Sequence, residues 1–498
     1  MILTILSILV CLHIQGNNDP EGLKQNGVVA EIDSLKITAE EFYLSYEYGP
    51  AFPKRKNDSK ERYLNYMINE KLLALDGYSR KIDTTEQAVE TLNEYRNDIM
   101  TEELFKQDIL SKVKIERHEI DSAVSKKNII LEIKWLFAVD DEKIKSYLTQ
   151  LKSGISFDSL FSQQINDTVF FDNRYMKIDR DRLGKKNPAL AAIADSLKAG
   201  EISLPVHTND GWYIIKLENA SEDLITTESE FEKAEQEAVS SIKKYKMDKL
   251  SDKYVNELMM QHNPVIKRDA FNFLRSYLGN LLLSKEKYSN WNLSGKLASA
   301  VNNLNNSGEE NHALASLVQL IDGKFTITDF LTWYRSRSHY INLNENDLKS
   351  FSASLENLIW RMVRDKLLAQ KAFERGFNNA ETVIKQTNWW KDKIISSMVK
   401  NEITTSVLLG NKEVKTGNKN DSLKVSAEID EEFNEKLLRR ILSLKKNHKI
   451  NINKKLLGQI NVSVENDPRA VEFYIVKQGT LIPRTPYPTI DKEWAKWE

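Results

Sequence analysis

The stretch LKAGEISLPVHTNDGWYIIKL, residues 197–217, closes a small segment of mixed helix and strand pattern. Its first residues end an alanine-rich apolar helix, which we expect to stop at Gly200. Strand-forming residues then flank the turn formers Asn209, Asp210 and Gly211. Short apolar runs on either side of such a turn predict two strands joined as a hairpin. The stretch therefore predicts a helix followed by a β-hairpin.

The residues before this stretch complete a small domain. IILEIKWLFAV, residues 129–139, is rich in β-branched and aromatic residues and predicts a strand. A helical pattern follows, broken at Gly154, with a short second helix behind it. The order β-α-α-α-β-β over residues 129–220 is typical of a small α/β domain. After it, residues 228–262 predict one charged amphipathic helix.

An internal repeat lies outside this domain. DGKFTITDF, residues 322–330, echoes DSLKITAEEF, residues 33–42, in which Thr38 and Glu41 predict the start of a helix. Helical apolar positions also match at a constant offset of 295, as Leu64 matches Ile359 and Tyr95 matches Trp390. A weaker echo joins NPVIKRDAF at 263 to NHKININKKLL at 447. We therefore expect one helical unit used twice, with the small domain inserted in the first copy only.

This pattern resembles the SurA, PrsA and PpiD group of exported peptidyl-prolyl isomerases and chaperones, whose helical body carries inserted parvulin domains. Residues 197–217 carry the most specific likeness, to the closing helix and hairpin of a parvulin domain. The resemblance implies a mainly α fold with an inserted small α+β parvulin-like domain, a duplicated helical chaperone unit and an elongated multi-domain body. The expected segments are 1–16 signal or lipoprotein-type segment, 27–128 first helical unit, 129–220 parvulin-like domain, 221–320 long helix and connection, 321–410 second helical unit, 411–427 polar linker, and 428–498 C-terminal helix and extended tail.

The catalytic positions of the family carry over in degraded form. The resemblance places Trp135 and Tyr213 where parvulins have their two histidines, and Asp172 or Asp179 as a loose match for the catalytic acid. The pocket for the substrate proline is implied at Phe137, Leu190, His207 and Trp212. Isomerisation requires a twisted amide to be held in an apolar pocket by tuned hydrogen bonds. The loss of the two histidines and of a clear catalytic acid favours a binding or spacer module over an efficient isomerase.

Composition narrows the classes of partner. Lysine and arginine number 71 against 72 acidic residues, so no global field directs the chain to nucleic acid. The single cysteine excludes a disulfide framework and a thiolate metal cluster, and the 7 histidines show no ligand spacing. We expect no metal, no cofactor and no nucleic acid, and the sequence leaves the oligomeric state open.

The N-terminus predicts export. MILTILSILV is long enough for the apolar core of a signal peptide and too short to span a bilayer. Cys11 follows it at the position of the acylated cysteine in a bacterial lipoprotein, and cleavage near Gly16 is the alternative. We expect a periplasmic protein, attached to a membrane through a lipid on Cys11 or released by cleavage.

Three functions follow from these patterns. The first is an exported foldase-type chaperone for unfolded, nascent or outer-membrane-bound polypeptides, with weak or absent prolyl isomerase activity. The second is an active peptidyl-prolyl cis-trans isomerase, or rotamase, which rests on the hairpin stretch alone. The third is a membrane-anchored assembly factor for one dedicated partner, suggested by Cys11 and the aromatic C-terminal tail.

Overall fold

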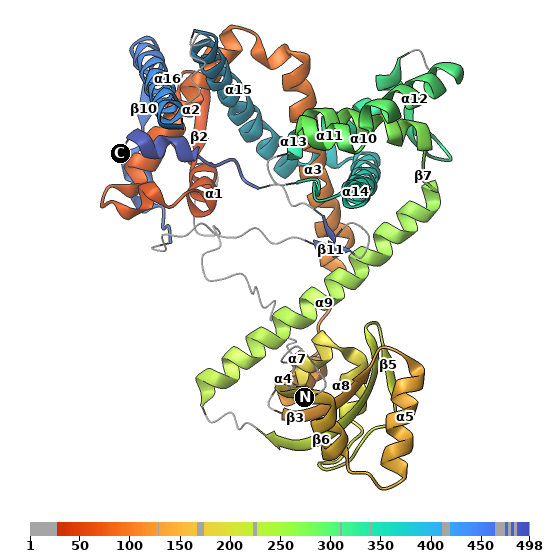
Figure 1. The fold of residues 1–498 in the computed structure, drawn as a ribbon. Helices are drawn as coiled ribbons and strands as arrows, with labels where there is room; N and C mark the ends of the chain where they lie inside the picture. The colour runs from red at the N-terminus through yellow and green to blue at the C-terminus, as the bar shows by residue number, and fades with distance from the viewer. Residues whose placement is uncertain are drawn as a thin grey trace, which may run out of the picture. The chain divides into compact units, whose positions relative to one another are not determined.

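The structure, a computed structural model, is 69% helical with several small sheets (Figure 1). It describes residues 27–127, 129–166, 174–222, 227–308, 311–338, 341–410, 419–463, 474–476, 480–482 and 486–497. The chain divides into two compact units, one of Met1–Ile109 with Leu250–Glu498 and one of Leu110–Lys249. The mainly α fold with a small inserted α+β domain is confirmed.

The unit of residues 110–249 is built around a four-stranded antiparallel sheet in the order β4-β3-β6-β5. Its strands are β3 (Ile129–Ala138), β4 (Tyr175–Asp179), β5 (Val206–Thr208) and β6 (Gly211–Glu222). One face packs on α5 (Asp141–Lys152) and α6 (Phe157–Asn166), and the other on α7 (Arg180–Lys186) and α8 (Pro188–Ala194). The predicted first strand, the helix break near Gly154 and the closing hairpin are all confirmed.

Two sequence predictions in this unit are wrong in detail. The alanine-rich helix ends at Ala194 instead of Gly200, because residues 200–203 leave the helix to hydrogen-bond with β6. Gly200 donates its amide to the Leu217 carbonyl at 2.7 Å and has a positive φ of 90°. Strand β4 and helix α7 were also missed, since the charged run around them hides their alternating pattern.

Helix α4 (Arg117–Lys127) packs on α9 (Glu228–His262) within the same unit. Val124 contacts Ala234 and Ala238 in a small apolar cluster. Lys246 reaches Glu119 at 2.6 Å. The long helix predicted over residues 228–262 is confirmed with those bounds.

The helical unit contains two similar sets of elements. The first set is β1 (Val28–Ile32), β2 (Leu35–Thr38), α1 (Ala39–Tyr48), α2 (Ser59–Ser79) and α3 (Glu86–Asp108). The second set is β8 (Ser316–Gln319), β9 (Lys324–Thr326), α13 (Ile327–Arg337), α14 (Leu348–Glu374) and α15 (Glu381–Gly410). Thr38 caps α1 through its side chain, as the sequence predicts, and Thr326 caps α13 in the same way. The duplication itself stays a prediction.

Each hairpin gains a third strand from elsewhere in the chain. β10 (Ile450–Ile452) pairs with β1, and β7 (Val265–Ile266) pairs with β8. The remaining elements are α10 (Arg268–Leu282), α11 (Lys285–Asn290), α12 (Leu293–Asn306), α16 (Lys419–Asn447), α17 (Lys454–Gln459), β11 (Tyr474–Val476) and β12 (Thr480–Ile482). Helix α16 begins inside the segment 411–427, which the sequence suggests is a linker.

The two sets pack across each other. Helix α2 packs on α15, and α14 packs on α3, while α3 and α15 also pack together. Tyr95 of α3 stacks on Trp390 of α15 with ring centroids 4.0 Å apart, and these are matching positions of the repeat. At matching helix ends, Arg80 pairs with Glu402 and Arg375 pairs with Asp108. The helical unit therefore has a core built jointly by both sets.

In the part of the chain that the structure describes, no helix is both long and apolar enough to cross a bilayer.

A buried ion pair joins the two sets. Arg337 of α13, 2% exposed, donates to Glu94 of α3 at 2.8 Å and contacts Asp98. Burial raises the pKa of Asp98 to about 7, although Arg337 opposes the rise. The guanidinium therefore compensates carboxylates that water does not reach.

We expect Arg337→Met to lower the free energy of unfolding of the full chain by about 3–5 kcal/mol, because it removes the guanidinium from Asp98 and leaves Glu94 paired with Lys366. Urea unfolding followed by tryptophan fluorescence measures the change. A carboxyl whose folded-state pKa is raised stabilises the fold as pH falls through that pKa. Without Arg337 the pKa of Asp98 rises further above about 7, so the variant takes up this proton at a higher pH than the parent chain. The deficit should therefore shrink as the pH falls from alkaline values to about 7.

Arg335→Met on the same helix is the matched control. Arg335 lies at the surface 3.6 Å from Glu90, and an exposed pair of this kind contributes about 0–1 kcal/mol. Equal losses for the two variants would contradict the role assigned to Arg337.

Candidate functional site

The sheet of the small unit brings three of the predicted site residues together. Trp135 and Phe137 alternate along β3, so both side chains project from one face. Phe137 pairs in register with Tyr213 of β6, and their ring centroids lie 5.0 Å apart. Trp135 and Tyr213 both pack at the edge of the apolar cluster under α7 and α8. This aromatic face is the position that the resemblance gives to the parvulin site.

Helix α8 supplies Leu190 to the same face. Asn187 caps this helix by accepting a hydrogen bond from the Leu190 amide at 3.2 Å, and Pro188 occupies its first turn. Leu190 is buried among Leu131, Ile133 and Ile215. Its side chain is therefore part of the core beneath the aromatic residues.

The phenol of Tyr213 is held by the hairpin turn. Its hydroxyl donates to Asp210 Oδ2 at 2.6 Å. Thr208 donates to the other carboxylate oxygen of Asp210. These bonds, from Thr208 first and Tyr213 second, lower the pKa of Asp210, so the carboxylate stays ionised at neutral pH. Where the family has a histidine, this chain thus has a phenol committed to an anionic acceptor.

Arg174 closes the other side of the aromatic face. Its guanidinium carbon lies 5.9 Å from the Phe137 ring, within the range of a cation–π contact. Its carbonyl accepts the Trp135 amide at 3.0 Å. Arg174 has a φ of 40°, which is uncommon for a residue with a Cβ. Sequence reasoning missed both Arg174 and Asp210, because one lies beside an unrecognised strand and the other reads as an ordinary turn residue.

The other two predicted substrate-binding residues lie on the opposite face. His207 pairs with Trp212 across β5 and β6, and their rings are 4.7 Å apart. Trp212 packs at the edge of the cluster under α5 and α6. Strand alternation separates this pair from Tyr213, the next residue along β6. The expected grouping of all four residues around one pocket therefore does not hold, since Phe137 and Leu190 lie on the other side of the sheet.

Asp172 and Cys11 lie outside the residues that the structure describes. The roles given to them, as degraded catalytic acid and as lipid attachment site, stay predictions.

The aromatic face offers two kinds of surface for contact with a peptide. Trp135, Phe137 and Tyr213 offer apolar ring surface, with Arg174 and Asp210 as a charged rim. Stabilising a twisted amide needs donors aimed at its developing charge in a water-excluded pocket. Here the phenol donates to Asp210 instead.

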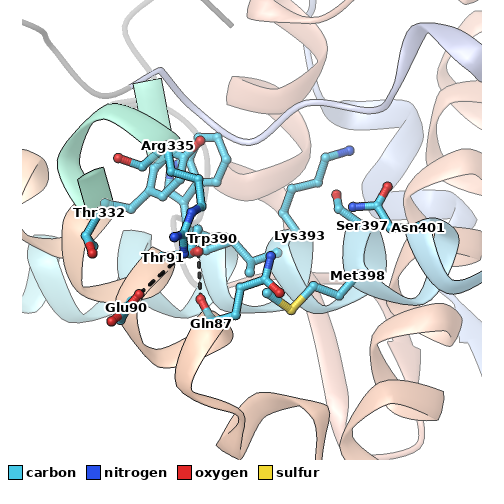
Figure 2. Close-up of a pocket in the computed structure, with 13 residues that line it drawn as sticks. Gln87, Glu90, Thr91, Thr332, Arg335, Trp390, Lys393, Ser397, Met398 and Asn401 are labelled. Carbon is cyan, nitrogen blue, oxygen red and sulfur yellow. Dashed lines mark hydrogen bonds and ion pairs between the residues drawn. The ribbon is translucent and has the colours of Figure 1, made fainter. Parts of the chain in front are cut away.

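A cavity also lies in the helical unit (Figure 2). Its volume is about 290 Å³, and α3, α13 and α15 supply its walls. Trp390 and Met398 give it apolar surface, while Gln87, Ser397 and Asn401 give it hydrogen-bonding groups. Arg335 and Glu90 form an ion pair at 3.6 Å beside it. The sequence did not reveal this cavity, because its walls come from both sets of the repeat.

Comparisons with known proteins agree with the architecture of the small unit. Residues 140–219 match the model of the Rotamase family, the PPIC-type PPIASE domain. The foldase protein PrsA of Oceanobacillus iheyensis is 24% identical over 238 residues, which cover 44% of this chain and 74% of that protein.

Among solved structures, PrsA of Bacillus cereus is 19% identical and covers 45% of this chain and 91% of that one, with a TM-score of 0.23. A structure described with two SurA-like chaperones of Campylobacter jejuni, PEB4 and Cj1289, is 17% identical and covers 47% of this chain and 97% of that one, with a TM-score of 0.22.

The hairpin turn beneath the aromatic face gives a stability prediction. Gly211 has a φ of 148°, and a Cβ there would lie 2.6 Å from the Phe137 ring and 2.7 Å from the Ala138 carbonyl oxygen. We expect Gly211→Ala to lower the stability of the small unit by about 1–3 kcal/mol, because both strain and overlap must be relieved. Calorimetry of the full chain measures the shift.

Gly184→Ala is the matched control. Gly184 lies in helix α7 with open space where a Cβ would stand. Alanine should therefore stabilise this unit by about 0.5–1 kcal/mol. Destabilisation by both variants would mean that the turn is not specially constrained.

Proposed function

This chain is a SurA/PrsA-like member of the peptidyl-prolyl isomerase and chaperone family, and from that premise we propose that it is an exported foldase-type chaperone that binds unfolded polypeptides. The observation that carries the proposal is the match of residues 140–219 to the PPIC-type PPIASE domain, in a unit inserted into a large helical unit. The resemblance puts Trp135 and Tyr213 at the family's two histidine positions. In this proposal the binding surfaces matter more than the isomerase chemistry.

The cavity of Figure 2 supports the binding of extended chains. An unfolded segment offers apolar side chains together with unpaired backbone amides and carbonyls. In the cavity, Trp390 and Met398 can contact the apolar side chains of such a segment. Gln87, Ser397 and Asn401 can hydrogen-bond with its backbone. Because amide and hydroxyl side chains can donate or accept, they tolerate different registers of a bound chain. The near-zero net charge fits clients of either sign.

Weak or absent isomerase activity follows from the chemistry of the aromatic face. Tyr213 donates to Asp210, and Trp135 packs against the core cluster. Export and attachment through Cys11 are part of the proposal and rest on the N-terminal sequence.

The chain should suppress aggregation of a chemically unfolded client at stoichiometric amounts, because binding removes exposed apolar segments from solution. Light scattering of a diluted, denatured reporter protein measures it. Gln87→Trp places a large ring against the cavity and should weaken suppression several-fold. Gln107→Trp, also on an exposed position of α3 but away from the cavity lining, is the control and should behave as the parent chain.

A lack of suppression by the parent chain would overturn the chaperone proposal. Recovery of one protein, rather than many, in a pull-down from the native host would favour the alternative of an assembly factor for a dedicated partner.

A protease-coupled assay on a proline peptide should give only the uncatalysed rate, because the Tyr213 hydroxyl donates to Asp210 and is not aimed at a twisted amide. The second alternative, an active isomerase, predicts an acceleration that Tyr213→Phe or Trp135→Ala reduces. Acceleration of that kind would place catalysis at this face and contradict the proposal of weak activity.

A further inference from the structure

The C-terminal segment, residues 486–497, lies in a slot of the helical unit. Trp494 is 1% exposed and stacks on Tyr66 with ring centroids 5.6 Å apart. Ile490 is buried in the same apolar cluster, and Tyr487 contacts the ring of Tyr48 at 5.0 Å. Among the described residues no strand pairing joins this segment to the unit. Side-chain contacts therefore provide most of the interactions that bind this segment to the helical unit.

Polar contacts fix the register of the segment. Glu70 of α2 accepts both the Trp494 indole N–H at 2.8 Å and the Asp491 amide at 3.1 Å. Lys393 of α15 lies 2.9 Å from Asp491, and Lys400 pairs with the same carboxylate. The slot therefore contacts an acidic residue and the tryptophan that follows it three positions later.

The second set of the helical unit contains the same arrangement without a tail. Trp333 of α13 donates its indole N–H to Asp365 at 3.0 Å and is also 1% exposed. Asp365 is the repeat counterpart of Glu70, at the offset of 295. Arg337, one helical turn after Trp333, pairs with Asp98, the counterpart of Lys393. A tryptophan and a charged residue therefore fill equivalent positions in both sets, with the sign of the charges reversed.

The first set lacks these side chains on its own helix. When the two sets are aligned at their capping residues, Thr38 and Thr326, Ser45 corresponds to Trp333 and Gly49 corresponds to Arg337. Ser45 lines a small remaining space of about 30 Å³ together with Glu70, Lys393, Pro488 and Thr489. The slot has room for the C-terminal segment because α1 carries Ser45 where α13 carries Trp333.

The charges on the slot call for an acidic ligand. Lys393 of α15 pairs with Glu70 of α2 at 2.8 Å, and Asp491 supplies a second carboxylate that pairs with both Lys393 and Lys400. Burial lowers the pKa of both lysines, that of Lys400 to about 8, so a second anion stabilises their charged forms.

We propose that this slot is a binding site for polypeptide segments that carry an acidic residue three positions before a tryptophan and form a 3-10 turn there, as residues 492–497 do, and that the C-terminal segment is its exchangeable resident ligand. The exchange with client chains rests on the proposed chaperone function. Trp390 donates to the Pro486 carbonyl at 3.0 Å and lines the cavity of Figure 2, as does Lys393. Slot and cavity thus share residues, and a client can occupy both when the tail leaves.

The test uses the full chain with the tail weakened by Asp491→Asn and Trp494→Ala, and the fluorescent peptide PYPTIDKEWAKWE, which copies residues 486–498. Fluorescence anisotropy should show saturable binding to this double variant. Binding to the parent chain should be at least about tenfold weaker, because the resident tail must first leave. A peptide with the aspartate changed to lysine and the first tryptophan to alanine is the control and should not bind.

Ser45→Trp in the double variant tests the location of the site. It should fill the slot as Trp333 fills its counterpart and abolish peptide binding, while circular dichroism shows an unchanged helical content. Lack of peptide binding to a folded double variant would overturn the proposal and make the tail a permanent part of the core. Binding that survives Ser45→Trp would place the site elsewhere.

The last part of the test asks whether client proteins exchange with the tail at the slot. Excess peptide should reduce aggregation suppression by the double variant, and the control peptide should not. If the parent chain fails to suppress aggregation but the peptide still binds the slot, the chaperone function fails and the segment-binding site stands. If suppression is strong and the peptide leaves it unchanged, client exchange at the slot is overturned.

Discussion

The stacking of Tyr95 on Trp390, where α3 meets α15, is the contact on which the helical unit depends. It lies between matching positions of two similar sets of elements, so each set completes its core with helices of the other. Helix α2 therefore needs α15 and α14 needs α3. The buried charges follow the same rule, since Arg337 of the second set compensates Glu94 and Asp98 of the first.

Similar sets that pack in the same way still differ in what fills their outer slots. Trp333 and Arg337 fill one slot from within helix α13, whereas the small side chain of Ser45 leaves room in the other for the C-terminal segment. A small side chain at one position thus lets a separate segment complete this part of the core. The cavity beside Trp390 extends this opening towards α3 and α13.

The sheet of the small unit fixes which side chains meet on its aromatic face. Backbone pairing holds β3 and β6 in register whatever side chains they carry, so Phe137 and Tyr213 meet as ring and phenol. The hydroxyl of Tyr213 then donates a hydrogen bond to Asp210 within the hairpin. A sheet tolerates such changes because its stability comes from apolar burial on both faces, which Leu131, Ile215 and Leu136 provide here.

Local patterns in the sequence determined the closing hairpin, the helix caps at Thr38 and Thr326, the long helix of residues 228–262 and the absence of histidine at the site, because spacing and residue type alone decide these features. The sequence could not place His207 and Trp212 on the far face, reveal Asp210 and Arg174, or show the slot and the cavity. Each of these depends on which distant segments meet: Glu70 and Trp494 are separated by most of the chain, and only the packing of α2 on α15 brings them together.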